Sequence, residues 1–177
     1  ETDGPLGAIA LYKTVKKLGA TPIIVCNDLL ARCLYNKFAV HVLPTAGDLS
    51  RRELDGSAVL ESYKPELIIS IELPGITADG KHYNMQGKDI SSFCIDFDPV
   101  MDQAPCKTVA IGDGGNEVGM AKVGSDLGLA NVIPCVTGCD ELVVADASNW
   151  GAHGLVAMLS SLTGYDFLAG WNNLDWL

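Results

Sequence analysis

The chain has 177 residues, of which 48% are hydrophobic and 19% charged, and its formal net charge is -10 at pH 7. A chain of this length and apolar content can bury one sizeable core. Its negative charge would repel nucleic acid and anionic membranes, and no uncharged run is long enough to span a membrane. We therefore expect no nucleic acid and no membrane as a binding partner, and the sequence is compatible with a homo-oligomer.

The six cysteines contain no C-x-x-C pair, and several of them lie in apolar segments. Such cysteines are typical of buried free thiols in a reducing compartment, so we expect a cytoplasmic location. Cys135 and Cys139 have no nearby histidine or further cysteine, which makes a metal site at this pair the weaker interpretation.

Apolar runs alternate with segments of helical periodicity along the chain. Strands are predicted at residues 22–26, 40–43, 67–71, 93–96, 108–111, 132–136 and 141–145. Helices are predicted at residues 5–18, 28–37, 50–63, 116–127 and 151–163. This alternation is typical of an α/β fold with a doubly wound, mostly parallel sheet flanked by helices. No linker or repeat divides the chain, so we expect residues 1–177 to form a single domain, trimmed at both ends; at the amino end the chain begins inside a motif.

A long segment without helical or strand pattern, residues 72–90, follows the predicted strand at 67–71. Loops of this length are commonly functional, although a mobile surface loop is an equal interpretation. The segment offers the polar side chains of Asp79, Tyr83 and Asn84. Further along, Asp96 and Asp98 form a D-x-D pair, which suits either a hard cation or a turn with a cap.

The most informative stretch is residues 108–124, TVAIGDGGNEVGMAKVG, in which an apolar run ends in an acidic glycine-rich loop. The glycines allow the backbone to approach a ligand closely. Asn116 is a suitable N-cap, and the free N–H groups of a helix starting near Glu117 would attract an anion beside Asp113. The simpler interpretation is a tight turn whose polar residues only cap the helix.

Nucleotide-binding motifs are absent from this loop and from the rest of the chain. Glu117 stands where the third glycine of G-x-G-x-x-G would lie, and no phosphate-binding G-x-x-x-x-G-K-[ST] occurs. We therefore expect no organic cofactor.

A third polar loop, residues 146–150, lies between the last predicted strand and an apolar helix, just as residues 1–5 precede the first helix. Loops at the carboxyl ends of parallel strands share one edge of the sheet. We therefore expect the loops at Asp3, Asp113 and Ser148 to converge on a single cleft, with residues 72–90 folded over it as a lid.

Four motifs taken together resemble the D-glutamate cyclase family. They are ETDGPLGA at 1–8, the segment with Glu72, Gly75, Asp79, Gly80 and Tyr83-Asn84-Met85, GDGGNEVGM at 112–120, and SNWG at 148–151. The resemblance implies conversion of D-glutamate to 5-oxo-D-proline with loss of water, and it makes the mitochondrial matrix an alternative location. The chain has Leu73 where the family pattern has arginine, so a cation that could hold a substrate carboxylate is missing there.

That activity requires the substrate amine to lose a proton and attack its own side-chain carboxyl carbon. We expect Asp113 or Glu117 to act as base and acid, with Asn116 as a donor to the oxyanion. The residues expected to contact substrate are Asp3, Glu72, Asp79, Tyr83, Asn84, Gly114, Gly115, Lys122, Ser148, Asn149 and Trp150. Lys122 either adds positive electrostatic potential at the site or is a solvated side chain. A divalent cation that bridges Asp113, Glu117 or Asp79 to the substrate is an alternative source of positive charge.

Two other functions remain open. A serine hydrolase would use Ser148 as nucleophile, although Asp146 and Trp150 occupy the glycine positions of G-x-S-x-G. A non-catalytic domain that binds an acidic metabolite would need the anion site but no base.

Overall fold

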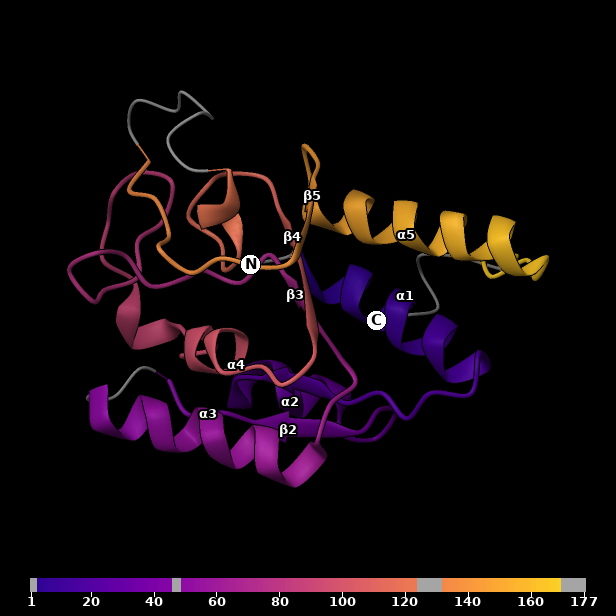
Figure 1. The fold of residues 1–177 in the computed structure, drawn as a ribbon, viewed down its shortest axis with the longest axis horizontal. Helices are drawn as coiled ribbons and strands as arrows, with labels where there is room; N and C mark the ends of the chain where they lie inside the picture. The colour runs from indigo at the N-terminus through magenta and orange to yellow at the C-terminus, as the bar shows by residue number, and fades with distance from the viewer. Residues whose placement is uncertain (1–2, 46–48, 124–131, 170–177) are drawn as a thin grey trace.

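The structure, a computed structural model, describes residues 3–45, 49–123 and 132–169 (Figure 1). Its α-helices are α1 (Pro5–Lys17), α2 (Asp28–Leu34), α3 (Leu49–Tyr63), α4 (Asp98–Asp102) and α5 (Ser148–Thr163). Its strands are β1 (Ile24–Cys26), β2 (Val40–Val42), β3 (Leu67–Ile71), β4 (Lys107–Gly112) and β5 (Glu141–Val144). Two short 3-10 helices are η1 (Ser91–Phe93) and η2 (Met120–Lys122). None of the helices in these ranges is long and apolar enough to cross a membrane.

The strands form parallel sheets flanked by helices, so the expected α/β class is confirmed. Within the described residues there are two sheets: β1 pairs with β2, and β3, β4 and β5 lie side by side in that order. In the larger sheet Ile71, the last residue of β3, lies opposite Ile111 of β4. The residues that follow these two strands therefore emerge beside each other at one edge.

The two faces of the larger sheet are covered differently (Figure 1). Helices α1 and α5 pack against each other and cover one face, where Ile111 is buried among Ala10, Leu11, Ala152 and Val156. Gly7 permits this contact, because a Cβ atom added to it would lie 2.6 Å from the Cβ atom of Ala152. Ile68 and Ala110 instead belong to a second cluster, which includes residues of α3 and α4.

Two of the predicted strands are wrong. Residues 93–96 hold the end of η1, and Ile95 makes only an isolated bridge to Thr45. Residues 132–136 form no strand, because their backbone bonds to loops: the N–H of Cys135 donates to Gly115 and that of Val136 to Ile76. An apolar run alone does not distinguish a strand from a buried loop of this kind.

Two helix predictions are also corrected. No α-helix begins near Glu117, because Gly119 adopts φ 95° and only the short η2 follows; residues 124–127 of that prediction lie outside the described ranges. Helix α5 begins at Ser148, earlier than expected. The short helix α4, whose first residues are Asp98 and Pro99, was not predicted.

Candidate active site

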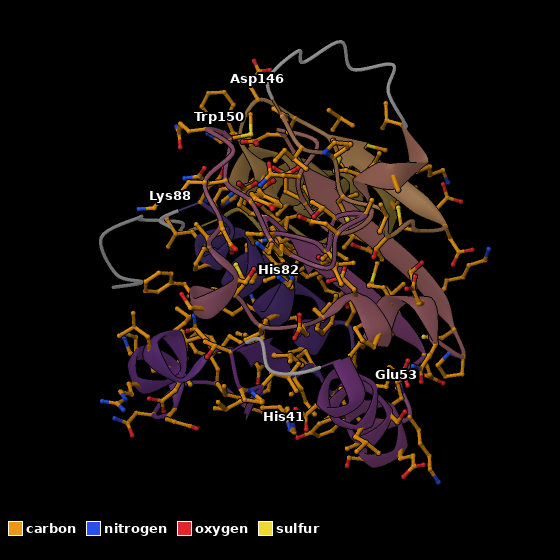
Figure 2. All side chains as sticks on the ribbon, turned by 90° about the vertical axis from the view of Figure 1, so that its left-hand side faces the viewer. His41, Glu53, His82, Lys88, Asp146 and Trp150 are labelled. Atoms are coloured by element: carbon orange, nitrogen blue, oxygen red, sulfur yellow. The ribbon has the colours of Figure 1, made fainter. Side chains whose placement is uncertain are left out.

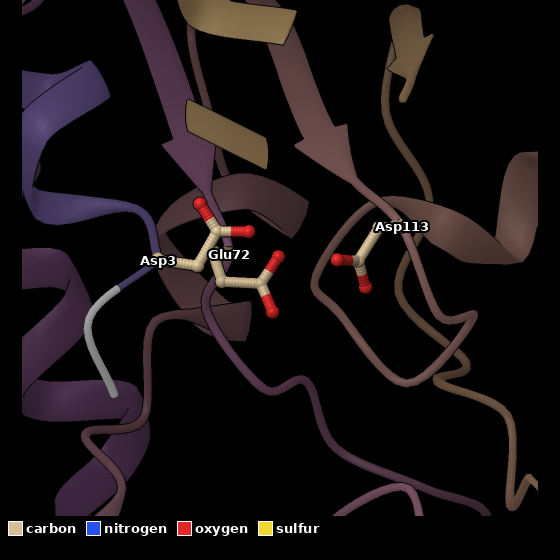
Figure 3. A group of neighbouring side chains, drawn as sticks. All are labelled: Asp3, Glu72 and Asp113. Carbon is tan, nitrogen blue, oxygen red and sulfur yellow. The ribbon is translucent and has the colours of Figure 1, made fainter. Parts of the chain in front are cut away.

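Three carboxylates meet at the carboxyl edge of the larger sheet (Figure 3). Glu72 directly follows β3, Asp113 directly follows β4, and Asp3 comes from the loop before α1. One oxygen from each side chain lies within 4.8 Å of the others. We call Asp3, Glu72 and Asp113 the acidic group. The structure thus brings together the loops that the sequence predicts to converge.

Asp3 is held by the first residues of α5. Its Oδ2 atom accepts a hydrogen bond from the N–H of Ser148 at 2.8 Å, and its Oδ1 atom accepts those of Asn149 at 2.7 Å and Gly4 at 3.0 Å. Unpaired N–H groups at a helix N-terminus favour an anion. The anion at the start of α5 is therefore Asp3 itself, whereas the sequence analysis expected Ser148 and Asn149 to contact substrate.

Glu72 has an unusual backbone conformation, with φ 51° in the left-handed region. Such a conformation in a residue other than glycine is sparsely populated and clusters at functional sites. The N–H of Glu72 donates to the carbonyl of Ile111 at 3.0 Å, and its Oε2 atom accepts a hydrogen bond from the Ser148 hydroxyl at 2.6 Å. Gly4, with φ 90°, lies against it, since an added Cβ atom would come within 2.9 Å of the Glu72 Cβ atom.

The surroundings of Glu72 raise the pKa of its carboxyl group to about 7. Burial is the largest cause, and the negative charges of Glu117, Asp113 and Asp3 raise the pKa further, while the hydrogen bond from Ser148 lowers it. A carboxyl group with a pKa near neutrality can both take up and release a proton at physiological pH.

Glu117 lies in the glycine-rich loop but is buried, with 2% of its surface exposed. Its Oε1 and Oε2 atoms accept hydrogen bonds from the N–H groups of Gly114 and Gly115, at 3.0 and 2.8 Å. The sequence analysis expected an anion at the N–H groups of a helix starting near Glu117; in the structure it is the N–H groups of Gly114 and Gly115 that bind an anion, the carboxylate of Glu117. Asn116 does not cap a helix; its Nδ2 atom donates to the carbonyl of Tyr83 at 3.0 Å.

Residues 72–90 pack on this glycine-rich loop. A Cβ atom added to Gly114 would lie 2.4 Å from the sulfur of Met85. Asp79 accepts hydrogen bonds from the hydroxyls of Thr77 and Tyr83, both at 2.7 Å. The Oδ1 atom of Asn84 accepts hydrogen bonds from the N–H groups of Gln86 and Lys88. The side chains of Asp79, Tyr83 and Asn84 therefore form hydrogen bonds with other groups of residues 72–90.

The remaining candidates lie around the acidic group or away from it. Ser148 is fully buried. Asn149 accepts a hydrogen bond from the N–H of Gly7 at 2.7 Å. Trp150 is 69% exposed and lies at the periphery of the molecule together with Asp146 (Figure 2). Lys122 donates to the carbonyl of Asp140, which precedes β5 at the opposite edge of the sheet.

A buried polar cluster elsewhere in the molecule joins the D-x-D pair, Asp96 and Asp98, to His82, which the sequence analysis did not connect with it. His82 is fully buried, and its Nε2 atom lies 3.4 Å from Oδ1 of Asp96 and 3.7 Å from Oδ2 of Asp98. The Oδ1 atom of Asp98 accepts hydrogen bonds from the N–H of Ile76 and the hydroxyl of Thr137, at 2.9 and 2.5 Å. This cluster anchors residues 76–82 to the start of α4.

Among the carboxylates that the sequence analysis offered for a divalent cation, neither Asp79 nor Glu117 joins Asp113 in a group of three or more close ligands in the part of the chain that the structure describes. Within the described residues its close acidic neighbours are Asp3 and Glu72, and one small cation between them could contact all three.

Comparison with known proteins gives two findings. A family model described as "D-glutamate cyclase-like, C-terminal" matches residues 1–173. The human protein "D-glutamate cyclase, mitochondrial" is 28% identical over 182 residues, an alignment that includes 90% of this chain and 29% of the human protein. The chain thus spans less than a third of the length of this relative.

Proposed function

This chain belongs to the D-glutamate cyclase-like, C-terminal family, and on that premise we propose that it converts D-glutamate to 5-oxo-D-proline and water. The observation that carries the proposal is the acidic group, because its three carboxylates come from three separated motifs and meet at the carboxyl edge of a parallel sheet. Ligands of open α/β sheets bind at this edge.

We propose that the acidic group receives the ammonium end of the substrate. Asp3 and Asp113 offer negative charge. Glu72 is partly buried and lies close to these two carboxylates. An ammonium group bound there lies next to a group that can remove its proton. Cyclisation then needs the side-chain carboxyl carbon to be folded back onto the nitrogen, and holding that geometry replaces a large entropic cost.

The reaction so proposed is an intramolecular condensation and needs no organic cofactor. The bond between the substrate nitrogen and its side-chain carboxyl carbon forms, and one carbon–oxygen bond of that carboxyl breaks to release water. Ser148 is less suited to a nucleophile's role, since its hydroxyl is fully buried and contacts the carboxylate of Glu72.

The test is incubation of the protein with each glutamate enantiomer, followed by chiral chromatography of 5-oxoproline. We expect product from D-glutamate much faster than from L-glutamate, and a loss of about 100-fold or more in Asp113→Asn, typical of a lost acid–base or charged group. Asp146→Asn is the matched control, because Asp146 closely follows the neighbouring strand β5 but is exposed. Equal inertness towards both enantiomers contradicts the proposal, and binding of D-glutamate without turnover would instead indicate a non-catalytic binding domain.

A further inference from the structure

We propose that Asn116 is a substrate-binding residue whose side-chain oxygen accepts a hydrogen bond from the nitrogen of the substrate, and that the side chain of Met85 covers this oxygen in the free protein. This inference rests on the proposed function and adds to it a group that holds the reacting nitrogen. The sequence analysis expected Asn116 to donate to the oxyanion instead.

The side-chain oxygen of Asn116 is a buried acceptor without a donor. Asn116 has 6% of its surface exposed, and its Oδ1 atom has no hydrogen-bond partner among the residues that the structure describes. The neighbouring N–H groups of Gly114 and Gly115 already donate to the carboxylate of Glu117. A buried acceptor in this state is unfavourable, and a ligand that brings a donor removes the penalty.

The orientation of the Asn116 amide follows from the carbonyl group next to it. The Nδ2 atom of Asn116 donates to the carbonyl oxygen of Tyr83 at 3.0 Å. Turning the amide over would place two acceptor oxygens against each other, so the nitrogen faces Tyr83 and the oxygen does not. The donor of Asn116 is therefore in use, and its acceptor is the group left for a ligand.

The oxygen lies on the loop that carries one carboxylate of the acidic group. Gly114 directly follows Asp113, and a Cβ atom added to Gly114 would lie 3.0 Å from the Oδ1 atom of Asn116. The same added atom would lie 2.4 Å from the sulfur of Met85, which is 42% exposed. Met85 thus stands between this part of the loop and solvent. A methionine side chain is unbranched and flexible, so its movement can open the oxygen to a ligand.

A neutral acceptor suits the nitrogen of the proposed reaction. At neutral pH the hydrogen-bond donors of D-glutamate are the N–H groups of its ammonium, because its carboxylates only accept. The nitrogen keeps at least one hydrogen in the ammonium, in the free amine and in the ring of 5-oxoproline. The oxygen of Asn116 can therefore hold it before and after ring closure. One fixed N–H restricts rotation of the nitrogen and helps to direct its lone pair at the side-chain carboxyl carbon.

The first test is carbon-13 NMR of the asparagine side-chain carbonyls, because such a resonance moves when the oxygen gains a hydrogen bond. The Asn116 signal is identified by its absence in Asn116→Ala. We expect D-glutamate and 5-oxo-D-proline to move this signal and to leave that of the exposed Asn36 in place. Glutarate, which has the same carbon skeleton and carboxylates but no nitrogen, should not move it. A signal that stays in place with both nitrogen-bearing ligands, or that moves equally with glutarate, overturns the inference.

The covering role of Met85 is tested without ligand. Met85→Ala should admit water to the oxygen of Asn116 and so move its carbonyl signal in the free protein. Met158→Ala is the matched control, because Met158 is an exposed methionine of α5, and it should leave the signal in place. An unmoved signal in Met85→Ala contradicts the covering role.

Kinetics separate this inference from the proposed function. Asn116→Ala should raise the KM for D-glutamate by about 10-fold to 100-fold, the usual effect of losing a hydrogen bond to a charged group, while Asn36→Ala keeps the wild-type value. A loss of stability alone lowers the amount of folded enzyme and leaves KM unchanged. A wild-type KM in Asn116→Ala overturns the inference while the proposed function stands. Absence of 5-oxoproline with wild-type protein overturns the proposed function, and a D-glutamate-dependent shift of the Asn116 signal would then still support its binding role.

Discussion

Asp3 caps the helix that begins at Ser148: its Oδ2 atom lies 2.8 Å from the backbone nitrogen of Ser148, although 145 positions separate the two residues in the chain. Most helices are capped by a residue just before them. Here the residue at that position, Ala147, has no side-chain oxygen, and the loop before α1 supplies one instead. The same contact places Asp3 in the acidic group, so it serves both the stability of α5 and the site.

Replacement of Asp3 should therefore affect stability and turnover together. We expect Asp3→Ala to lower the free energy of unfolding by about 1 kcal/mol, as for other lost helix caps, and to abolish cyclisation. Asn27→Ala is the matched control, because Asn27 caps α2 by accepting the N–H of Leu30 and lies outside the acidic group. Urea denaturation and product assays check both variants. Equal loss of activity in the two variants would show that Asp3 acts only through stability.

Glu117→Gln should destabilise the protein, although a loop glutamate suggests a harmless change. The two carboxylate oxygens accept two N–H groups in a buried site, whereas Gln offers one oxygen and directs an NH₂ group at the other donor. A buried donor left unsatisfied costs about 1–3 kcal/mol. Thermal unfolding would measure the loss, with the exposed Glu141→Gln as control. An unchanged melting temperature in Glu117→Gln would contradict this view of the loop.

The raised pKa of Glu72 also predicts a pH dependence of stability. Its value of about 7 in the folded chain lies above the ordinary value of about 4.3, so the folded chain binds this proton more tightly than the unfolded chain. The contribution of the proton to stability is complete below about pH 4 and is lost as the pH rises through about 7. Glu72→Gln should therefore gain stability relative to wild type between pH 5 and 8, because Gln has no proton to lose. Urea midpoints measured across this range test the difference, and a constant difference would contradict it.

The cluster of His82, Asp96 and Asp98 should be costly to disturb. Removing the acceptor of a buried hydrogen bond leaves its donor unsatisfied, which typically costs about 1–3 kcal/mol. We expect Asp98→Ala to fall in this range, since Asp98 also accepts hydrogen bonds from Ile76 and Thr137. Asp102→Ala, at the exposed end of the same helix, should cost little. Calorimetry of both variants decides the matter, and similar melting temperatures would exclude an anchoring role for the cluster.

The sequence predicts the parallel strands and the convergence of the loops, because both follow from short-range patterns and the geometry of parallel sheets. LIISI and TVAIG are each followed directly by an acidic residue at the carboxyl end of a strand, a signal that could have ranked Glu72 beside Asp113. The sequence does not predict the bond between Ser148 and Glu72, since 76 positions separate them. Nor does it reveal that Glu117 turns back onto its own loop.

The anion sites show the limit of pattern analysis most clearly. The sequence analysis expected an anion at the start of a helix near Glu117, an α-helix that the structure does not form there, and it expected substrate at Ser148 and Asn149, where α5 begins. Local sequence cannot say which anion binds at either place. In both places the chain supplies its own carboxylate, Glu117 in the first and Asp3 in the second. Only the three-dimensional arrangement distinguishes a site for a ligand from one that the protein satisfies internally.

The packing of α1 against α5 has a consequence for synthesis of the protein. Gly7 and Ala152 touch across this interface, and the N–H of Gly7 donates to Asn149, so the first helix completes its packing only when the last one is present. A nascent chain that ends before Ser148 has Asp3, Glu72 and Asp113 but lacks the groups that hold Asp3 and Glu72 in place. Because translation proceeds from the amino terminus, the acidic group can be assembled only after the start of α5 has been synthesised.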